Sequence, residues 1–351
     1  MRVTFVLPAP VRVPMGGAAV VYRHAAGLAA RGHEVRVVAP RRGAGGIAAH
    51  VRAAAVRIRD RLHGLPDAPF YDASGVTTVE VDAVGEGSFP SGEAVIATGH
   101  QTISWVESLR DRCGQKVYFL QGDERALDAS AGATWARPFA RIAVSQWLAA
   151  TVEAAGHPVI GVVPNAVDPA AFALDRPLAG RDARVVALYH RHPVKGPETL
   201  ARALGDLRRL RPDVQADVVA ARPPSHRLPE YVRVHVRPDA LALRALYNRA
   251  SVALHTSRLE GWGLVPMEAA ACGCAVVATA SRGVAEFLRA GVSMREVPVG
   301  DAHALAEGAA DLLADPPARI ALAAAGMADV ARFSWDASTA EFERLLLATQ
   351  R

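Results

Sequence analysis

Two carboxylates flank a glycine turn in the segment SRLEGWGLVPMEAAACGCAVVAT, residues 257–279. Glu260 comes just before the Gly-Trp-Gly sequence, and Glu268 lies about one turn inside a helix that we expect to begin at Leu264 or Val265. The first amides of a helix attract anions, and glycines let a phosphate approach the backbone closely. The pattern therefore predicts a bound phosphate here, with both carboxylates reaching hydroxyl groups of the same molecule.

Each acidic residue also has an ordinary explanation. A glutamate in a first helical turn is stabilised by the helix dipole, and a glutamate in a loop is usually solvated. The combination of both acids with the glycines favours a binding site.

A second group of candidates lies in the segment ALYHRHPVKGPETLARAL, which predicts a strand, a cationic loop and a helix beginning near Pro197. Fixed cations and helix N-termini can stabilise the charge that develops on a departing diphosphate. Arg191 and Lys195 are the candidates for that role. Solvated surface charge is the alternative explanation for both.

The elements that must position these residues are short apolar strands that alternate with helices. Such strands are typical of parallel sheets buried on both faces, and in these sheets ligands bind at the carboxyl ends of the strands. A stretch rich in Pro, Gly and Asp after Pro164 predicts a linker, after which the alternation restarts. The expected strands are 76–81, 95–97, 117–120, 142–144, 185–189, 217–220, 232–236, 252–256 and 275–279, and the expected helices of the second half are 197–211, 240–250, 265–272 and 284–289.

The sequence thus predicts an α/β protein with two doubly wound, Rossmann-like domains that face a cleft. We expect an N-terminal acceptor domain at 1–166, a C-terminal donor domain at 167–334, and a final helix at about 335–351 that packs back on the first domain.

Composition excludes several other classes of protein. A chain of 351 residues with 51% hydrophobic and 21% charged residues should fold throughout as two domains. No segment has the length and hydropathy of a signal peptide or membrane span, so a cytoplasmic location is expected. The net charge of +5 comes without a basic and aromatic cluster on one element, which argues against nucleic acid as a partner. The oligomeric state stays open.

The spacing of Glu260 and Glu268, the glycines between them, the Lys-Gly pair at Lys195 and the segment VVPNAVD together resemble glycosyltransferase family 4, which has the GT-B fold. The resemblance covers most of the chain. It implies retaining transfer of a sugar from a nucleotide diphosphate sugar to a saccharide or glycoside hydroxyl. It also implies a front-face mechanism, no metal ion and no cofactor besides the donor substrate.

By this resemblance Glu260 contacts hydroxyls of the donor sugar, Glu268 contacts the ribose, and the amides around Gly263 hold the diphosphate. Base selection falls near Val236 and Arg237. The expected donor-binding residues are Gly16, Gly17, Gly261, Trp262, Gly263, Leu264, Val265, Glu268, Val236 and Arg237, and the expected catalytic residues are Arg191, Lys195, Glu260, Gln121, His100 and Asp123.

The first domain departs from the family pattern in the segment VYFLQGDE. The family commonly has a histidine near this strand end, whereas this chain has Gln121, which cannot take a proton at neutral pH. Deprotonation of the acceptor would then fall to Asp123, Glu124 or the leaving phosphate, or to no protein group. His100, after the preceding strand, is a further candidate, although a lone histidine there is more often structural.

Three alternatives follow from the sequence. A dehydrogenase would need a G-x-G-x-x-G turn after the first strand, and only the Gly16–Gly17 pair is present. A non-catalytic nucleotide-sugar-binding protein would explain Gln121. The amphipathic segment 47–64, which carries several arginines, predicts either a solvated helix face or a weak peripheral contact with anionic lipid.

Overall fold

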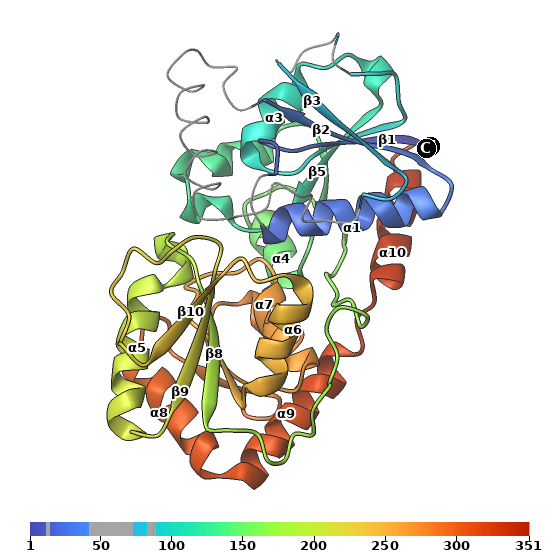
Figure 1. Cartoon of the computed structure of the whole chain (residues 1–351). Coiled ribbons are helices and arrows are strands. Elements are labelled where there is room, and N and C mark those ends of the chain that lie inside the picture. Colours follow the sequence, from blue (N-terminus) through green and yellow to red (C-terminus); the bar gives the residue numbers. More distant parts are fainter. Residues whose placement is uncertain (12–14, 42–72, 83–86, 88, 351) are drawn as a thin grey trace. The chain divides into compact units, whose positions relative to one another are not determined.

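The computed structural model describes residues 1–11, 15–41, 73–82, 87 and 89–350, so the amphipathic segment 47–64 lies outside the described residues. The chain divides into two compact units (Figure 1). Unit 1 comprises Met1–Pro164 and Trp335–Arg351, and unit 2 comprises Asn165–Ser334. The predicted α/β class with two Rossmann-like domains is confirmed.

Unit 1 is built on a parallel sheet of seven strands among its described residues, in the order β3-β2-β1-β4-β5-β6-β7. The order reverses direction between β1 and β4, which is the point at which doubly wound sheets bind ligands. The strands are β1 (Arg2–Val6), β2 (Glu34–Pro40), β3 (Val76–Val81), β4 (Ala94–Ala97), β5 (Gln115–Leu120), β6 (Ala140–Ala143) and β7 (Gly161–Val162).

The last helix of the chain, α10 (Trp335–Ala348), packs on unit 1 beside α1 (Gly16–Ala30), as the red and blue helices of Figure 1 show. Phe342 of α10 is fully buried and stacks on Phe5 and on His24. The close approach requires a glycine, because a Cβ at Gly27 would lie 2.8 Å from the Thr339 hydroxyl. Two further helices of this unit are α3 (His100–Glu107) and α4 (Gln146–Ala154).

Unit 2 repeats this architecture with six described strands in the order β10-β9-β8-β11-β12-β13, all parallel. Here the order reverses between β8 and β11. The strands are β8 (Arg184–Tyr189), β9 (Gln215–Ala220), β10 (Val232–Val236), β11 (Val252–His255), β12 (Ala275–Thr279) and β13 (Met294–Val297), and the helices are α5 (Pro197–Leu210), α6 (Ala240–Arg249), α7 (Leu264–Ala271), α8 (Ala302–Ala314) and α9 (Pro316–Val330).

Hydrophobic periodicity explains how these helices cover the sheet. In α5, Leu200, Ala203, Leu204 and Leu207 are fully buried and recur at intervals of three and four residues. Burial of one such leucine contributes about 2 kcal/mol.

One predicted element was wrong and another was missed. The expected helix at 284–289 is a single 3₁₀ turn, Gly283–Glu286, because the backbone here packs against the loop that carries Glu260. Strand β13 escaped prediction because Arg295 and Glu296 are exposed and interrupt its apolar pattern.

No helix in the described part of the chain is long and apolar enough to cross a membrane.

Candidate functional site

Two loops that follow the adjacent strands β8 and β11 are bonded to each other at the reversal point of the unit 2 sheet. The Thr256 hydroxyl donates to the Lys195 carbonyl at 2.9 Å, and the Arg258 amide donates to the Val194 carbonyl at 2.7 Å. Gly196 has a φ of +64°, and a Cβ there would lie 2.1 Å from the Thr256 carbonyl oxygen. Only glycine therefore allows the two loops to approach this closely.

This arrangement brings together two of the predicted residues, Lys195 and Glu260. The Lys195 ammonium donates to both carboxylate oxygens of Glu260 at 2.8 Å, and the Ser257 hydroxyl donates to Oε1 at 2.7 Å. The Glu260 side chain is only 13% exposed. Burial by itself would raise the pKa of the Glu260 carboxyl, but the Lys195 charge and the hydrogen bonds from Lys195 and Ser257 hold it below its usual value.

The loop that carries Glu260 also packs on the turn after β12. The Glu260 amide donates to the Ser281 carbonyl at 2.9 Å, and a Cβ at Gly283 would lie 2.7 Å from the Glu260 carbonyl oxygen. Trp262 is 3% exposed, and its ring stacks on Phe287 with centroids 5.4 Å apart. Its indole therefore anchors the loop in the core, and the predicted part of Trp262 in donor binding stays a prediction.

The helix α7 begins where the sequence places it, with Gly263 at its N-cap. Gly263 has a φ of +106°, which a side chain would strain. Leu264 and Val265 supply the first amides of the helix, which have no partner within the helix and can bind an anion. The helix start thus lies at the residues where the sequence predicts a backbone anion site, and Gly261 lies in the turn that leads to it.

Glu268 lies on α7 and accepts a hydrogen bond from the buried Tyr247 hydroxyl at 3.3 Å. Burial raises the pKa of the Glu268 carboxyl to about 8, and the Tyr247 hydrogen bond offsets this only in part. Without a ligand, this carboxyl is largely protonated at neutral pH.

The remaining predicted residues of unit 2 are Arg191, Val236 and Arg237, and none of them is bonded to the Lys195–Glu260 pair. Arg191 is exposed. Val236 ends β10, the outer strand of the sheet, and Arg237 follows it with a φ of +48°. The Arg237 guanidinium donates to the Ala221 carbonyl at 3.0 Å, which fixes the loop conformation.

In unit 1, the loops after β1, β4 and β5 meet at the reversal point of that sheet. The Gln121 side chain donates to the Thr98 carbonyl at 3.4 Å, and its Oε1 would lie 3.3 Å from a Cβ at Gly17. Oε1 is buried and has no hydrogen-bond partner among the described residues. Gly17 follows Gly16 in the first turn of α1, so the structure brings these three predicted residues into one cluster.

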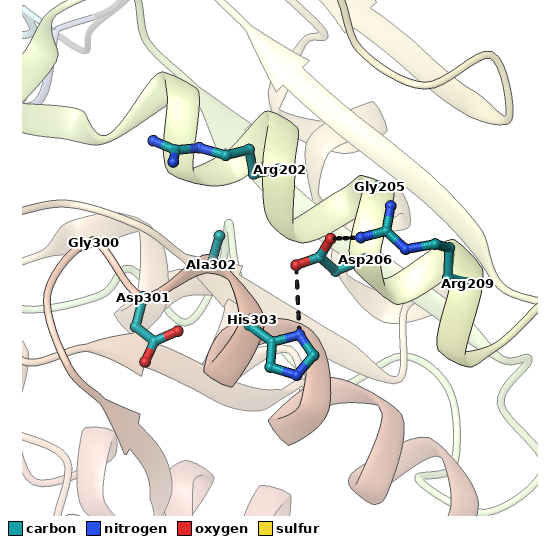
Figure 2. Close-up of a pocket in the computed structure, with 8 residues that line it drawn as sticks. All are labelled: Arg202, Gly205, Asp206, Arg209, Gly300, Asp301, Ala302 and His303. Atoms are coloured by element: carbon teal, nitrogen blue, oxygen red, sulfur yellow. Dashed lines mark hydrogen bonds and ion pairs between the residues drawn. The ribbon is translucent and has the colours of Figure 1, made fainter.

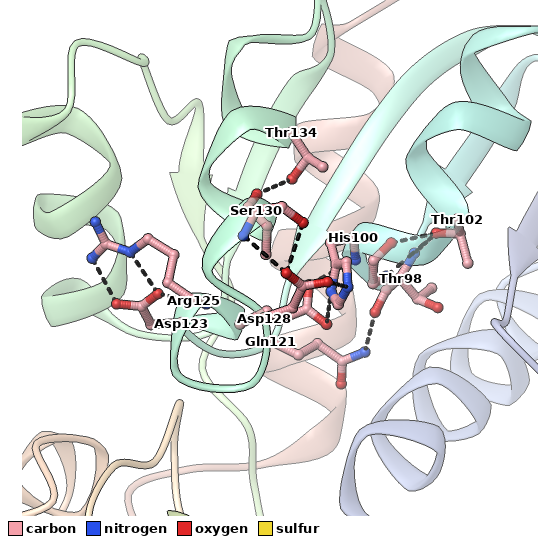
Figure 3. A network of polar contacts seen from close by, with 12 residues as sticks. Thr98, His100, Thr102, Gln121, Asp123, Arg125, Asp128, Ser130 and Thr134 are labelled. Atoms are coloured by element: carbon pink, nitrogen blue, oxygen red, sulfur yellow. Dashed lines mark hydrogen bonds and ion pairs between the residues drawn. The ribbon is translucent and has the colours of Figure 1, made fainter.

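Around this cluster, His100 lies between two carboxylates (Figure 3). Its Nδ1 is 3.3 Å from Glu124 Oε1 and its Nε2 is 3.6 Å from Asp128 Oδ2. The Tyr118 hydroxyl donates to the same Glu124 carboxylate at 3.0 Å. Asp123 is bound by both arms of the Arg125 guanidinium, at 2.8 and 2.7 Å, which argues against it as a proton acceptor.

Two family models match the chain and leave few residues between them. The model described as Glycosyltransferase Family 4 matches residues 14–171, and the model described as Glycosyl transferases group 1 matches residues 183–315. The second match contains the Lys195–Glu260 pair and Glu268. The first half of the chain thus matches glycosyltransferase family 4, and the second half matches glycosyl transferases group 1.

Sequence relatives are also glycosyltransferases. The D-inositol 3-phosphate glycosyltransferase of Thermobispora bispora is 30% identical over 201 residues, which cover 51% of this chain and 47% of that protein. The phosphatidyl-myo-inositol mannosyltransferase of Mycolicibacterium smegmatis is 32% identical over 222 residues, which cover 58% of this chain and 56% of that protein. The chain thus spans about half the length of the curated relatives it matches.

Solved structures of glycosyltransferases share the fold over nearly the whole chain. Anabaena HepE in complex with UDP and glucose has a TM-score of 0.72 and 18% identity, with 99% of this chain and 100% of that chain covered. Sucrose-phosphate synthase from Thermosynechococcus elongatus has a TM-score of 0.77 and 18% identity, with 99% and 98% covered. The chain therefore has the GT-B fold.

A hollow of about 520 Å³ lies elsewhere on unit 2, between α5 and the start of α8 (Figure 2). Asp206 Oδ2 lies 3.6 Å from His303 Nδ1, and the Asp206 carboxylate forms an ion pair with the Arg209 guanidinium. The arginine and histidine side chains are more than half exposed, and none of the predicted site residues lines the hollow. Within the described ranges, no group of three or more His, Cys, Asp or Glu side chains is placed to hold a metal ion.

Three residues that lie against Glu260 or Glu268 escaped sequence analysis: Ser257, His255 and Tyr247. Ser257 could have been noticed, because it lies three residues before Glu260 in the same loop. His255 ends an otherwise apolar strand, and Tyr247 lies in a different helix from its partner Glu268. No sequence signal links those two residues to the site.

Proposed function

We propose that the chain is a retaining glycosyltransferase that transfers a sugar from a nucleotide diphosphate sugar to a hydroxyl of a saccharide or glycoside, without a metal ion. The observation that carries this proposal is the ion pair of Lys195 with Glu260. It joins the loops after β8 and β11, in the same unit as the N-terminus of α7. These groups match two chemical parts of such a donor: the ammonium and the helix amides suit its phosphates, and the carboxylate suits its hydroxyls.

In this proposal unit 2 binds the donor. The amides of Gly263, Leu264 and Val265 bind the diphosphate, and Lys195, assisted by Arg191, neutralises the charge that the leaving diphosphate gains. Glu260 accepts hydrogen bonds from donor-sugar hydroxyls, and Glu268 binds the ribose. Positioning and stabilisation of the leaving group supply most of the rate, as front-face attack requires.

Unit 1 binds the acceptor in this proposal. The buried Gln121 Oε1 has no hydrogen-bond partner among the described residues, so it can accept a hydrogen bond from a hydroxyl group. His100, beside Glu124 and Asp128, can accept the acceptor proton. Five of the relatives are named D-inositol 3-phosphate glycosyltransferase, so phosphorylated inositol belongs among the acceptors to be tested. A cytoplasmic location remains a prediction from the sequence.

The test is an assay of the purified chain with UDP-, GDP- and dTDP-sugars, in the presence of EDTA. We expect one donor to be hydrolysed slowly and transferred faster once a suitable acceptor is added. NMR of the product should show the anomeric configuration of the donor. Lys195→Ala should lower turnover about 100- to 1,000-fold, whereas the other lysine variant, Lys116→Ala, should retain full activity. An inverted product or equal activity of both variants would contradict the proposal.

The second candidate function is nucleotide-sugar binding without turnover. It is favoured by Gln121, which stands where the family commonly has a histidine. Calorimetry separates the two functions: tight binding of a nucleotide sugar, with neither hydrolysis nor transfer, would support the binding protein.

A further inference from the structure

His255 is a buried imidazole next to the proposed donor site. It is the last residue of β11, and its side chain is 9% exposed. Its Nε2 has no hydrogen-bond partner among the described residues and lies 3.6 Å from Glu260 Oε1, just beyond hydrogen-bonding distance. A polar atom left unpaired in a buried position costs free energy, so the unpaired Nε2 beside the Glu260 carboxylate favours a second state in which it is paired.

The charged groups that act on this imidazole are Glu260 and Lys195. Burial lowers the pKa of His255 to about 4, and of the two charges Glu260 raises this pKa whereas Lys195 lowers it further. His255 is therefore neutral in the free protein at neutral pH. Glu260 has enough partners in that state, because Lys195 and Ser257 satisfy both carboxylate oxygens.

The proposed function places a conflicting demand on Lys195. Its ammonium lies within 2.8 Å of both Glu260 oxygens and is also the cation available to the donor diphosphate. When the ammonium moves toward the diphosphate, Glu260 loses its counter-charge while it stays in a largely buried position. Both changes favour a protonated His255, because the Lys195 cation moves away from the imidazole and the diphosphate anion arrives.

We propose that His255 takes up one proton from solvent when a nucleotide diphosphate sugar binds, and donates a hydrogen bond from Nε2 to Glu260 in place of Lys195. This inference rests on the proposed function of the site. His255 is then a positioning residue, which keeps the Glu260 carboxylate ionised and oriented toward the donor hydroxyls.

The proposal predicts the sign of a pH dependence. A pKa that rises on binding makes the complex tighter at lower pH, so donor affinity falls as pH rises through the pKa of His255 in the complex. The slope approaches tenfold per pH unit above that pKa. Glu268 also titrates near neutrality, so the contribution of His255 must be measured as a difference between variants.

The test is calorimetry of UDP-glucose and GDP-mannose binding at pH 7, in two buffers with different heats of ionisation. We compare the wild type with His255→Gln, whose amide nitrogen can replace Nε2 as a donor but cannot take up a proton. His303→Gln removes an exposed imidazole of the same unit and is the control. The wild type and His303→Gln should take up between half and one proton more than His255→Gln.

Each outcome decides between the inference and the proposed function. If neither of these nucleotide sugars nor a dTDP-sugar binds the wild type, both are wrong. If binding occurs with equal proton uptake in the wild type and His255→Gln, only the role of His255 is wrong. Should His255→Gln fail to fold, ¹⁵N NMR of the wild-type imidazoles gives the same answer, since a His255 that stays neutral in the complex contradicts the proposal.

Discussion

Removal of the Lys195 ammonium is the most informative change to the ion pair of the candidate site. Lys195→Met keeps most of the apolar stem but leaves the Glu260 carboxylate with the Ser257 hydroxyl and a neutral His255. At 2.8 Å and an effective dielectric constant of about 20, the gross attraction between the two charges is about 6 kcal/mol. Desolvation of the buried carboxylate offsets most of it, and hydrogen bonds to charged groups contribute about 1.5–3 kcal/mol net.

The Lys195 side chain is 36% exposed, so we expect a loss near the lower end, about 2 kcal/mol of unfolding free energy at pH 7.5. The pH dependence follows from the lowered pKa of Glu260. The stabilisation is present above the pKa of the unfolded carboxyl and is lost as pH falls through the folded pKa. The difference between Lys195→Met and wild type should therefore largely persist at pH 4.5 and shrink once the pH is below the folded pKa, so we compare pH 7.5 with about pH 3.

Urea unfolding at both pH values measures these differences. A double-mutant cycle with Glu260→Gln isolates the pair, since Lys195→Met/Glu260→Gln leaves no unpaired charge and should recover about 1 kcal/mol. The control is Lys116→Met, because Lys116 donates only to the Glu107 carbonyl in unit 1. The same loss at both pH values, with no recovery in the double variant, would refute the ion pair in solution.

Three further predictions concern the elements around the site. Glu268→Gln should stabilise the free protein by about 1–3 kcal/mol at pH 8. The reason is the raised pKa of Glu268, because of which the folded wild type loses stability as pH rises from about 4 to 8. Urea unfolding from pH 5 to 8.5 should show a flatter dependence of the unfolding free energy on pH for the variant. Gly196→Ala should lower the unfolding free energy by more than about 2 kcal/mol and abolish nucleotide binding, since the added Cβ would overlap the Thr256 carbonyl. The control Gly205→Ala has open space in the interior of α5 and should raise the unfolding free energy by about 0.5–1 kcal/mol. Equal effects of the two variants in thermal unfolding and calorimetry would contradict this reasoning. Gly27→Ala should loosen the docking of α10 at a cost of about 1–3 kcal/mol, seen as faster amide hydrogen exchange in that helix, and unchanged exchange would argue against the contact.

Much of the fold could be predicted from the sequence because the strands are short and apolar. The strands at 76–81, 232–236 and 275–279 have the predicted bounds, since turn residues and charged residues mark their ends. The 3₁₀ turn at Gly283–Glu286 could not be predicted. Its conformation depends on backbone contacts with Trp262 and Glu260, which lie more than twenty residues earlier in the chain.

The candidate site was predictable in its residue types but not in its contacts. The sequence identified Lys195 and Glu260 separately, as a cation and a carboxylate beside helix starts. It could not pair them, because they lie 65 residues apart and meet only where β8 and β11 become neighbours. The buried position of Trp262 and the unpaired Nε2 of His255 are likewise absent from any local pattern.

The sequence by itself determined the alternation of strands and helices, the two Rossmann-like halves, and the carboxylates and glycines around the start of α7, because hydrophobic period and turn chemistry are local properties. The tertiary structure alone decided the protonation of Glu268, the ionisation of Glu260 and the neutrality of His255. Those properties depend on burial and on charges brought from other strands and helices, and no local stretch of sequence contains them.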